Sequence, residues 1–428
     1  MTETTTTAGT AAALARRADE LDAADPLGHL RERFAGDDDA NGVVAYLDGN
    51  SLGRPPRATA AALERFVREE WGGRLIRGWY EGWLEWAEEI GDRLGRVALG
   101  AAAGQVLVAD STTVMLYKLA RAAVAARPER REIVLDENDF PTDRYVLEGI
   151  ATERGLELRF VTTPLDGGVT PEQIAAAVGP TTALVALSHV NYRSAHIADA
   201  AAITRTAHAA GALVLWDLSH SAGAVEVALD DWGADLAVGC TYKYLNGGPG
   251  SPAFGYVRAE HQDVVRQPVQ GWLGRREPFA MGPGYEPADG LRRFMSGTPP
   301  VLAMVPLHAG LDLLEEAGMA AVRAKSVALT EYAIEIADAL LAPHGVTVAS
   351  PRDSARRGSH VTLRHAAFRG LLDGLWRDGV LADFREPDCL RIGLSPLTTG
   401  FAELYRGLEV LAEAVATHGG RRSDKREA

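Results

Sequence analysis

The residues from about Gln105 to Gly255 alternate short apolar runs with longer stretches in which apolar residues recur at helical spacing. The apolar runs are QVLVAD, EIVLDEN, LELRFVTT, TALVALSHV and ALVLWDLSH, and stretches such as TTVMLYKLARAAVAA follow them. Short apolar runs are typical of buried strands, and their alternation with helices predicts a mostly parallel sheet covered on both faces. We therefore predict an α/β large domain, with ligands bound beyond the carboxyl ends of its strands.

A smaller α+β domain is predicted after the Pro-Pro pair at 299–300. Two amphipathic helices, around 302–316 and 319–341, precede the runs VTVAS, HVTLRH and CLRIGLSP, which read as antiparallel strands interleaved with helices around Arg369 and Ala402. We expect three parts: an N-terminal segment that packs on the small domain (1–60), the large domain (61–298) and the small domain (299–428). The first dozen residues and the tail HGGRRSDKREA read as disordered.

Composition limits the function classes. The chain has 428 residues, 46% hydrophobic and 24% charged, which is typical of a globular protein. Its net charge of −14 argues against nucleic acid or an anionic membrane surface as a partner. The sequence shows neither a membrane-spanning run nor a secretory apolar core, and Cys240 and Cys389 form no disulfide framework or zinc motif. We expect a cytoplasmic protein that binds a small molecule and no metal.

Two residues of opposite charge, Asp217 in LVLWDLSH and Lys243 in GCTYKYLNGGPG, follow runs that read as strands. Pyridoxal phosphate requires an amine that forms a Schiff base with its aldehyde and a carboxylate that keeps its ring nitrogen protonated. Taken singly, the two residues also fit a loop lysine and a helix cap. Together they favour a pyridoxal phosphate site, in which Lys243, once an amino-acid substrate displaces it, moves protons at the substrate α-carbon.

The phosphate of such a cofactor has a candidate site at STTVMLYKL, where Thr112 and Thr113 begin a predicted helix. Unpaired amides and the helix dipole attract phosphate there, although hydroxyl residues also cap helices that bind nothing. Tyr242 is a candidate phenolic donor to the same phosphate. Phe140 is a candidate to stack on the pyridine ring, and it also fits a core aromatic.

Six segments, in this order, resemble kynureninases: YLDGNSLG, DENDFPTDRYVLEGI, LSHVNYRSA, LWDLSHSAGAVEVAL, DWGADLAVGCTYKYLNGGPGSPAF and FMSGTPPVLAM. The resemblance extends from about Tyr46 to Pro396, and DLSHSAG followed by TYKYLNGGPG is specific within the aminotransferase-like class. It implies an aspartate aminotransferase-like fold with pyridoxal 5'-phosphate as cofactor. The implied reaction is hydrolysis of L-kynurenine, or of its 3-hydroxy form, to an anthranilate and L-alanine in tryptophan catabolism and NAD biosynthesis.

The resemblance also implies roles for single residues. Lys243 would carry the cofactor, and Asp217 would pair with the ring nitrogen, supported by His220. Phe140 would stack on the ring, with Asp143 as a second carboxylate nearby. Other matches to cofactor-pocket positions are Thr112, Thr113, Ser188 and Tyr242. Trp272 and Thr298 match residues that reach the phosphate from the neighbouring subunit, which implies a homodimer with shared active sites.

For the substrate, the resemblance assigns its α-carboxylate to Arg391, and a guanidinium suits that bidentate task. Without the resemblance, Arg391 would read as a surface ion-pair residue. Asn50 and Ser51 are further candidates for substrate binding. Trp79 and Thr298 match the aryl-ring positions of bacterial enzymes, which predicts a preference for unsubstituted L-kynurenine. A ring-substituted kynurenine in a biosynthetic route stays an alternative.

Water must add to the γ-carbonyl of the substrate, and Tyr242 and Lys243 are our candidates for the proton donor and acceptor in that step. Three other functions stay open. A cysteine desulfurase or related lyase would share the fold but needs a mobile catalytic cysteine, which neither cysteine of this chain fits. An aminotransferase and a non-catalytic protein with an inactive pocket are the other two.

Overall fold

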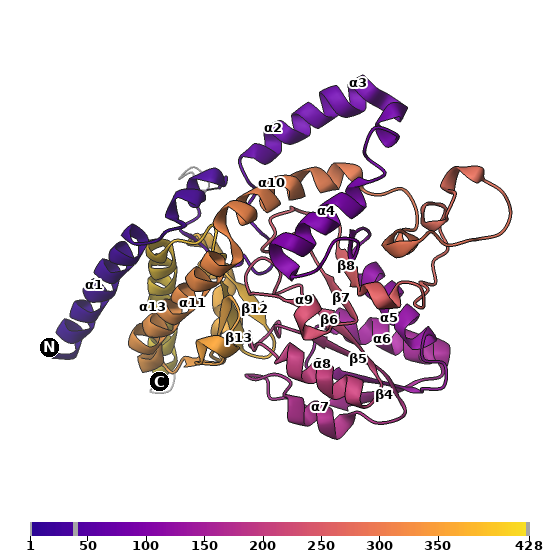
Figure 1. Cartoon of the computed structure of the whole chain (residues 1–428). Coiled ribbons are helices and arrows are strands. Elements are labelled where there is room, and N and C mark those ends of the chain that lie inside the picture. The colour runs from indigo at the N-terminus through magenta and orange to yellow at the C-terminus, as the bar shows by residue number, and fades with distance from the viewer. Residues whose placement is uncertain (1, 37–41, 425–428) are drawn as a thin grey trace.

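The large unit of the computed structural model, which describes residues 2–36 and 42–424, is built on a seven-stranded sheet in the order β2-β8-β7-β6-β5-β3-β4 (Figure 1). Strands β3 to β7 are parallel, and β8 runs antiparallel to β2 and β7. The sheet is therefore mostly parallel, as predicted. Its strands are β2 (Val106–Val108), β3 (Glu132–Asp136), β4 (Glu157–Val161), β5 (Thr182–Ser188), β6 (Leu213–Asp217), β7 (Leu236–Gly239) and β8 (Phe254–Val257).

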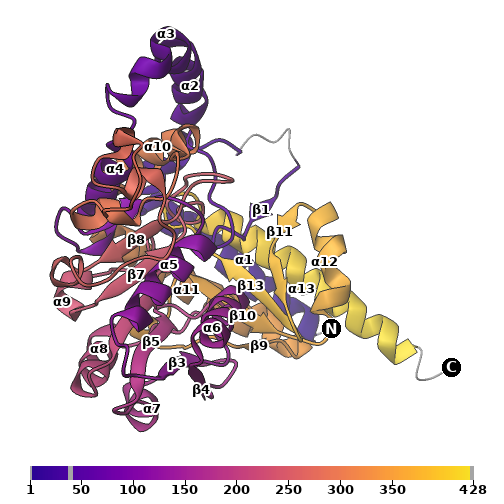
Figure 2. The ribbon, with the colours of Figure 1, turned by 90° about the vertical axis from the view of Figure 1, so that its right-hand side faces the viewer.

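Helices cover this sheet, and each follows one of its strands along the chain, α5 and α6 within a few residues of the strand end (Figures 1 and 2). Polar side chains fix where they start. Ser111 Oγ accepts a hydrogen bond from the backbone of Val114 at α5, and Asp199 accepts one from Ala202 at α8. Side chains at strand ends and helix starts therefore gather at one edge. The helices are α5 (Thr112–Ala125), α6 (Pro141–Arg154), α7 (Pro171–Ala177), α8 (Ala200–Ala209) and α9 (Leu229–Trp232).

A helical arm projects from the large unit at the top of Figure 1. It consists of α2 (Ala58–Arg65), the irregular turns Phe66–Trp71 and Leu75–Trp79, and α3 (Gly72–Arg74). Helix α4 (Trp86–Leu94) follows it, and α10 (Val301–Ala317) contacts both α2 and α4. The apolar side chains of α10 lie in the same core as those of the seven-stranded sheet. This helix therefore belongs physically to the large unit.

The smaller unit has its own core between a four-stranded antiparallel sheet and two long helices. The sheet has the order β12-β13-β10-β9, and a separate parallel pair joins β1 to β11. Its elements are β1 (Ala45–Tyr46), α11 (Met319–Ile336), β9 (Thr347–Val348), β10 (His360–Arg364), α12 (Phe368–Arg377), β11 (Val380–Leu381), β12 (Asp383–Arg385), β13 (Cys389–Gly393) and α13 (Phe401–Asp424).

The prediction of disordered chain ends is wrong for the part of the ends that the structure describes. Helix α1 (Thr2–Ala23) packs against α13, which continues to Asp424 (Figure 2). Leu14 and Ala18 of α1 are buried in the smaller core. Once packing has anchored part of a helix, each further residue gains one backbone hydrogen bond for the conformational entropy that it loses. A polar end segment can therefore continue the helix. Residues 425–428 of the predicted tail lie outside the described residues.

Candidate active site

A cavity of about 150 Å³ lies at the carboxyl ends of β5, β6 and β7, where the starts of α5 and α6 meet them. Nine residues that the sequence singled out face it together, although they come from five segments far apart in the chain. The lining residues are Thr112, Thr113, Phe140, Thr142, Asp143, Ser188, Val190, Tyr192, Asp217, Ser219, His220, Tyr242 and Lys243. Asp217 and Lys243 thus lie on one small cavity.

The amine of Lys243 contacts a buried histidine. Its Nζ lies 3.0 Å from Nε2 of His220. Burial, and then the charge of Lys243, hold the pKa of His220 well below its usual value. The imidazole is therefore neutral and accepts a hydrogen bond from the lysine, which fixes the position of the amine.

Three carboxyl groups are buried around this cavity. Asp217 accepts a hydrogen bond of 2.6 Å from the backbone of Ser219. Burial and the charges of Asp217 and Asp139 raise the pKa of Asp143 well above its usual value. Burial and Asp136 raise the pKa of Asp139 to about 7. The raised pKa favours the protonated form of Asp143.

Asp139 was not among the predicted site residues, yet it holds two of them. Its carboxylate accepts hydrogen bonds from the backbone of Ser188 at 3.0 Å, from Ser188 Oγ, and from the backbone of Phe140 at 3.1 Å. One buried group thus fixes residues from β5 and from the start of α6. The sequence signal was the position of Asp139 beyond β3, at the same edge as Asp217.

The phosphate candidates lie at the start of α5. Thr112 and Thr113 are the first two residues of this helix, so their amides have no acceptor within it. A second cavity of about 420 Å³ adjoins here, because Thr112 and Tyr242 line both, and Thr298 lines the second one. Trp272 lines neither cavity; it is 38% exposed and its ring contacts Phe279.

Arg391, on β13, is 1% exposed and lies between the two units. It donates to the backbone oxygen of Tyr192 at 2.8 Å and to Ser51 Oγ at 3.0 Å, and it pairs with Asp383. Its Nε and both amide atoms of the buried Asn50 have no hydrogen-bond partner among the described residues. Unsatisfied buried polar groups of this kind are often the mark of a ligand site.

Trp79 does not line the catalytic cavity of its own chain. It lies in the arm, half-buried, with its ring edge-on to Trp83 at 5.3 Å. Phe66 and Trp86 complete this aromatic cluster. The role of Trp79 in substrate binding stays a prediction.

Four cavity residues were missed by the sequence reasoning: Thr142, Val190, Tyr192 and Ser219. Thr142, Val190 and Ser219 each lie one or two positions from a residue that was named, and Tyr192 lies four positions after Ser188; all are within the segments FPTD, SHVNY and DLSH. Their own residue types carry no chemical signature, so only their neighbourhood could have indicated them.

Comparison with known proteins decides the family. A family model described as the kynureninase C-terminal domain matches residues 322–411. A kynureninase from Pseudomonas fluorescens is 44% identical over 92% of this chain and 93% of its own length. One from Burkholderia pseudomallei is 42% identical over 94% of this chain and 95% of its own. The chain belongs to the kynureninase family.

Solved structures place the same fold in a wider class. A cysteine desulfurase from Thermococcus onnurineus NA1 matches with a TM-score of 0.79, over 91% of this chain and 98% of that one. Its sequence is only 20% identical, so this similarity concerns the fold alone. The predicted aspartate aminotransferase-like architecture is confirmed.

Proposed function

We propose that this protein is a pyridoxal 5'-phosphate-dependent hydrolase that cleaves the Cβ–Cγ bond of L-kynurenine, giving anthranilate and L-alanine. Membership of the kynureninase family supports the reaction. The observation that carries the proposal is that Asp217 and Lys243 line one cavity, beside a helix start suited to phosphate. Tryptophan catabolism and NAD biosynthesis are the corresponding pathways.

The residues present fit the cofactor. Lys243 offers the amine, Asp217 the carboxylate for the ring nitrogen, and Phe140 an aromatic face on the same cavity. Thr112 and Thr113 offer backbone and hydroxyl donors to the phosphate. When bound, pyridoxal phosphate forms a Schiff base with an amino acid and withdraws electrons from the carbons next to it.

Protons in this reaction are assigned to Lys243 and Tyr242. The neutral imidazole of His220 keeps the lysine amine at one position, from which it takes and returns the proton of the substrate α-carbon. Burial raises the pKa of Tyr242, so its phenol keeps its proton at neutral pH. Tyr242 can therefore donate a proton to the γ-carbonyl oxygen as water adds.

Substrate binding is assigned to the junction of the two units. Arg391 would receive the α-carboxylate, with Asn50 and Ser51 beside it, because the buried Nε and amide then gain partners. Trp79 and Thr298 would flank the aryl ring, and we expect unsubstituted L-kynurenine to be preferred over its 3-hydroxy form.

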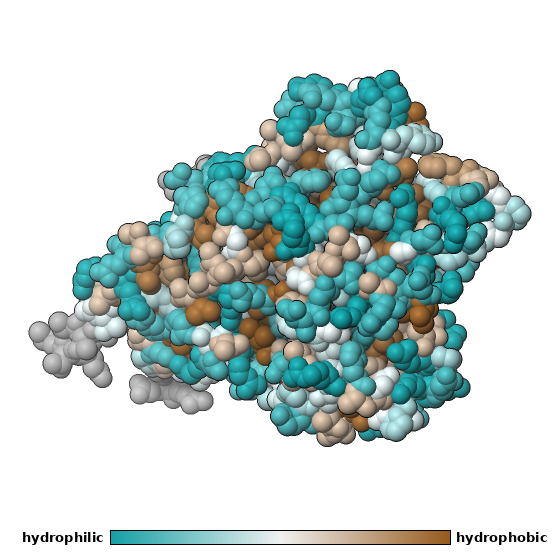
Figure 3. All heavy atoms as spheres, viewed as in Figure 1, coloured by the Kyte–Doolittle hydropathy of each residue, from teal (hydrophilic) through white to brown (hydrophobic). Residues whose placement is uncertain are grey.

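We further propose a cytoplasmic homodimer in which Trp272 and Thr298 serve the cavity of the partner. Exposed apolar side chains support an interface on the arm, where Leu75 is 59% and Ile76 is 69% exposed, and on the loop beside it. Tyr80 of the arm contacts Phe279 of that loop at 5.5 Å. Figure 3 shows apolar residues at the surface in both places. In the described residues, no helix has the length and apolar character that crossing a membrane requires.

One assay tests the function directly. The purified holoenzyme is incubated with L-kynurenine while anthranilate fluorescence and alanine release are followed, and equimolar products are expected. L-cysteine serves as the control substrate, because the solved relatives include desulfurases. Cys240 and Cys389 are both buried, and burial raises the pKa of each thiol, so no sulfide is expected. Sulfide release without anthranilate would reject the proposal.

A further inference from the structure

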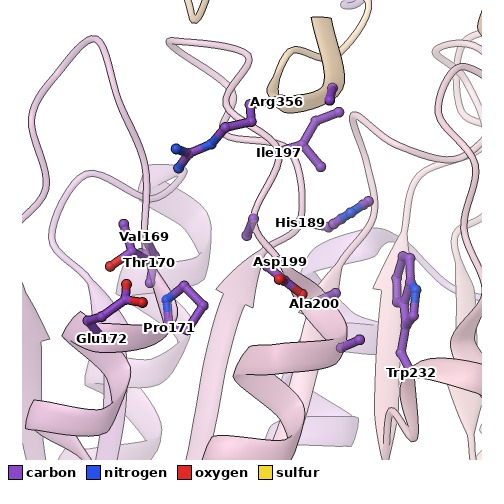
Figure 4. A pocket seen from close by; sticks show the side chains of 13 residues that line it. Val169, Thr170, Pro171, Glu172, His189, Ile197, Asp199, Ala200, Trp232 and Arg356 are labelled. Atoms are coloured by element: carbon purple, nitrogen blue, oxygen red, sulfur yellow. The ribbon is translucent and has the colours of Figure 1, made fainter. Parts of the chain in front are cut away.

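A groove of about 590 Å³ lies at the junction of the two units, away from the catalytic cavity (Figure 4). None of its lining residues lines the catalytic cavity. The starts of α7 and α8 form two walls, and Arg356, from the turn Ser354–Arg356 of the smaller unit, lies over them. Grooves between two packed units are common positions for small-molecule sites.

One wall carries a buried histidine with a free ring nitrogen. His189 is 3% exposed, and burial lowers its pKa to about 3, so it is neutral. Its Nδ1 lies 2.9 Å from Ser221 Oγ, whose hydroxyl has no other partner within residues 2–36 and 42–424. Either tautomer of the neutral ring forms this hydrogen bond, because a hydroxyl both donates and accepts. Nε2 has no partner in the same residues, so this ring nitrogen is available to a ligand.

The groove also offers a site for a carboxylate. Arg356 Nη2 contacts Nε2 of His196 at 2.8 Å, and burial and Arg356 itself lower the pKa of that histidine to about 4. The guanidinium charge is therefore not neutralised by its neighbour. Ala200 and Ala201, the first residues of α8, also line the groove, and amides at a helix start have no acceptor within the helix.

Two carboxylates on the same rim make a simple anion a poor match. Glu172 and Asp199 both line the groove and are exposed. A hydrogen bond to its own backbone, with smaller help from Thr170 and Arg356, lowers the pKa of Glu172, so it is ionised at neutral pH. A ligand that carries an ammonium beside its carboxylate satisfies both kinds of group.

An apolar wall completes the groove. The ring of Trp232 lies 4.7 Å from that of His189, and Ile197 and Pro171 face the same space (Figure 4). A flat ring can rest on Trp232, where a polar group on or beside that ring would form a hydrogen bond with His189 Nε2.

We propose that this groove is a second ligand site that binds an aromatic α-amino acid as the zwitterion. Its carboxylate pairs with Arg356, its ammonium with Glu172 and Asp199, and its ring lies against Trp232. The site does not depend on the reaction assigned to the catalytic cavity.

Calorimetric titration of the holoenzyme with L-phenylalanine tests the site. Borohydride reduction beforehand prevents amino acids from reacting at Lys243. Arg356→Gln is expected to weaken binding about tenfold, because a charge-assisted contact is lost. Arg352→Gln, which removes an exposed arginine paired with Asp338, is the matched control and should change nothing. Equal affinity in all three proteins, or no binding in any, overturns the proposal.

A second titration tests the zwitterion. The probe 3-phenylpropionate is L-phenylalanine without its amino group, and it is expected to bind about fivefold more weakly, since it gains nothing from the rim carboxylates. Glu172→Gln should reduce the difference in affinity between the two probes, because it weakens the binding of L-phenylalanine and leaves that of 3-phenylpropionate unchanged. If 3-phenylpropionate binds as tightly as L-phenylalanine, the assignment of the ammonium is wrong.

Discussion

The two cavities beside β5 use neighbouring residues of one extended segment for different purposes. Ser188 and Val190 face the catalytic cavity, whereas His189, between them, faces the groove. Around the catalytic cavity the carboxyl groups are buried, and burial raises the pKa values of Asp139 and Asp143. On the groove the rim carboxylates are exposed, so water screens them. Burial thus gives the first cavity reactive groups, and exposure limits the second to weak binding.

The largest expected effect separates chemistry from binding. Lys243→Ala should lower kcat for L-kynurenine by at least about 10⁴-fold, because no other amine among the lining residues can hold the cofactor or move the α-proton. Binding of L-phenylalanine to the groove should stay unchanged in calorimetry. If the variant keeps a measurable fraction of wild-type kcat, the role of Lys243 is wrong.

Removing either arginine should separate the two sites. Arg391→Ala is expected to raise KM for L-kynurenine about 100-fold, because a charge-assisted bidentate contact is lost. The change in kcat should be smaller. Arg356→Gln should leave both kinetic constants near those of the wild type. Steady-state kinetics at fixed pH measure this, and an unchanged KM in Arg391→Ala would disprove the carboxylate assignment.

The pH dependence of stability should differ between the buried and exposed carboxyl groups. The pKa of Asp139 is about 7 in the folded protein and near 4 when unfolded, so the folded state alone keeps this proton between those values. Asp139 therefore lowers the free energy of unfolding as pH rises from 4 to 7. Asp139→Asn should remove this decline, about 3 kcal/mol between pH 4 and 7, in urea unfolding of the cofactor-free protein.

The control for that measurement comes from the groove. Glu172→Gln removes an exposed carboxylate whose pKa is lowered, so any stability it contributes is present at neutral pH and is lost only in acid. Its unfolding free energy should follow that of the wild type from pH 5 to 8. Parallel curves for Asp139→Asn and the wild type would show that Asp139 is already ionised in this range.

The smallest effect concerns the substrate ring. We expect kcat/KM for L-kynurenine to exceed that for 3-hydroxykynurenine about tenfold, because a ring hydroxyl without a partner in the site costs about 1 to 2 kcal/mol. Competition between the two substrates in one reaction measures the ratio. A ratio below one would assign the enzyme to the hydroxylated substrate.

The sequence was most informative where one strand end carried one chemical group. Asp217 and Lys243 could be named because Asp217 ends a buried strand and Lys243 follows one, and parallel strands bring such ends to one edge. Asp139 also lies just beyond a strand end. Its hydrogen bond with the backbone of Ser188, however, depends on how β3 and β5 are placed beside each other, which the spacing of residues in the sequence does not specify. Tyr192 contacts Arg391 only because the two units pack together, whereas Asp383 pairs with Arg391 across the neighbouring strands β12 and β13.

The alternation of strands and helices, the family and the candidate residues for cofactor binding could all be inferred from the sequence, because periodicity and short motifs are local properties of the chain. Only the packed fold sets which carboxyl groups have raised pKa values, which buried atoms lack partners, and that His189 lines a groove rather than the catalytic cavity. Those outcomes depend on burial and on contacts between distant segments. Neither the burial of a group nor its contacts with distant segments can be read from the order of the residues alone.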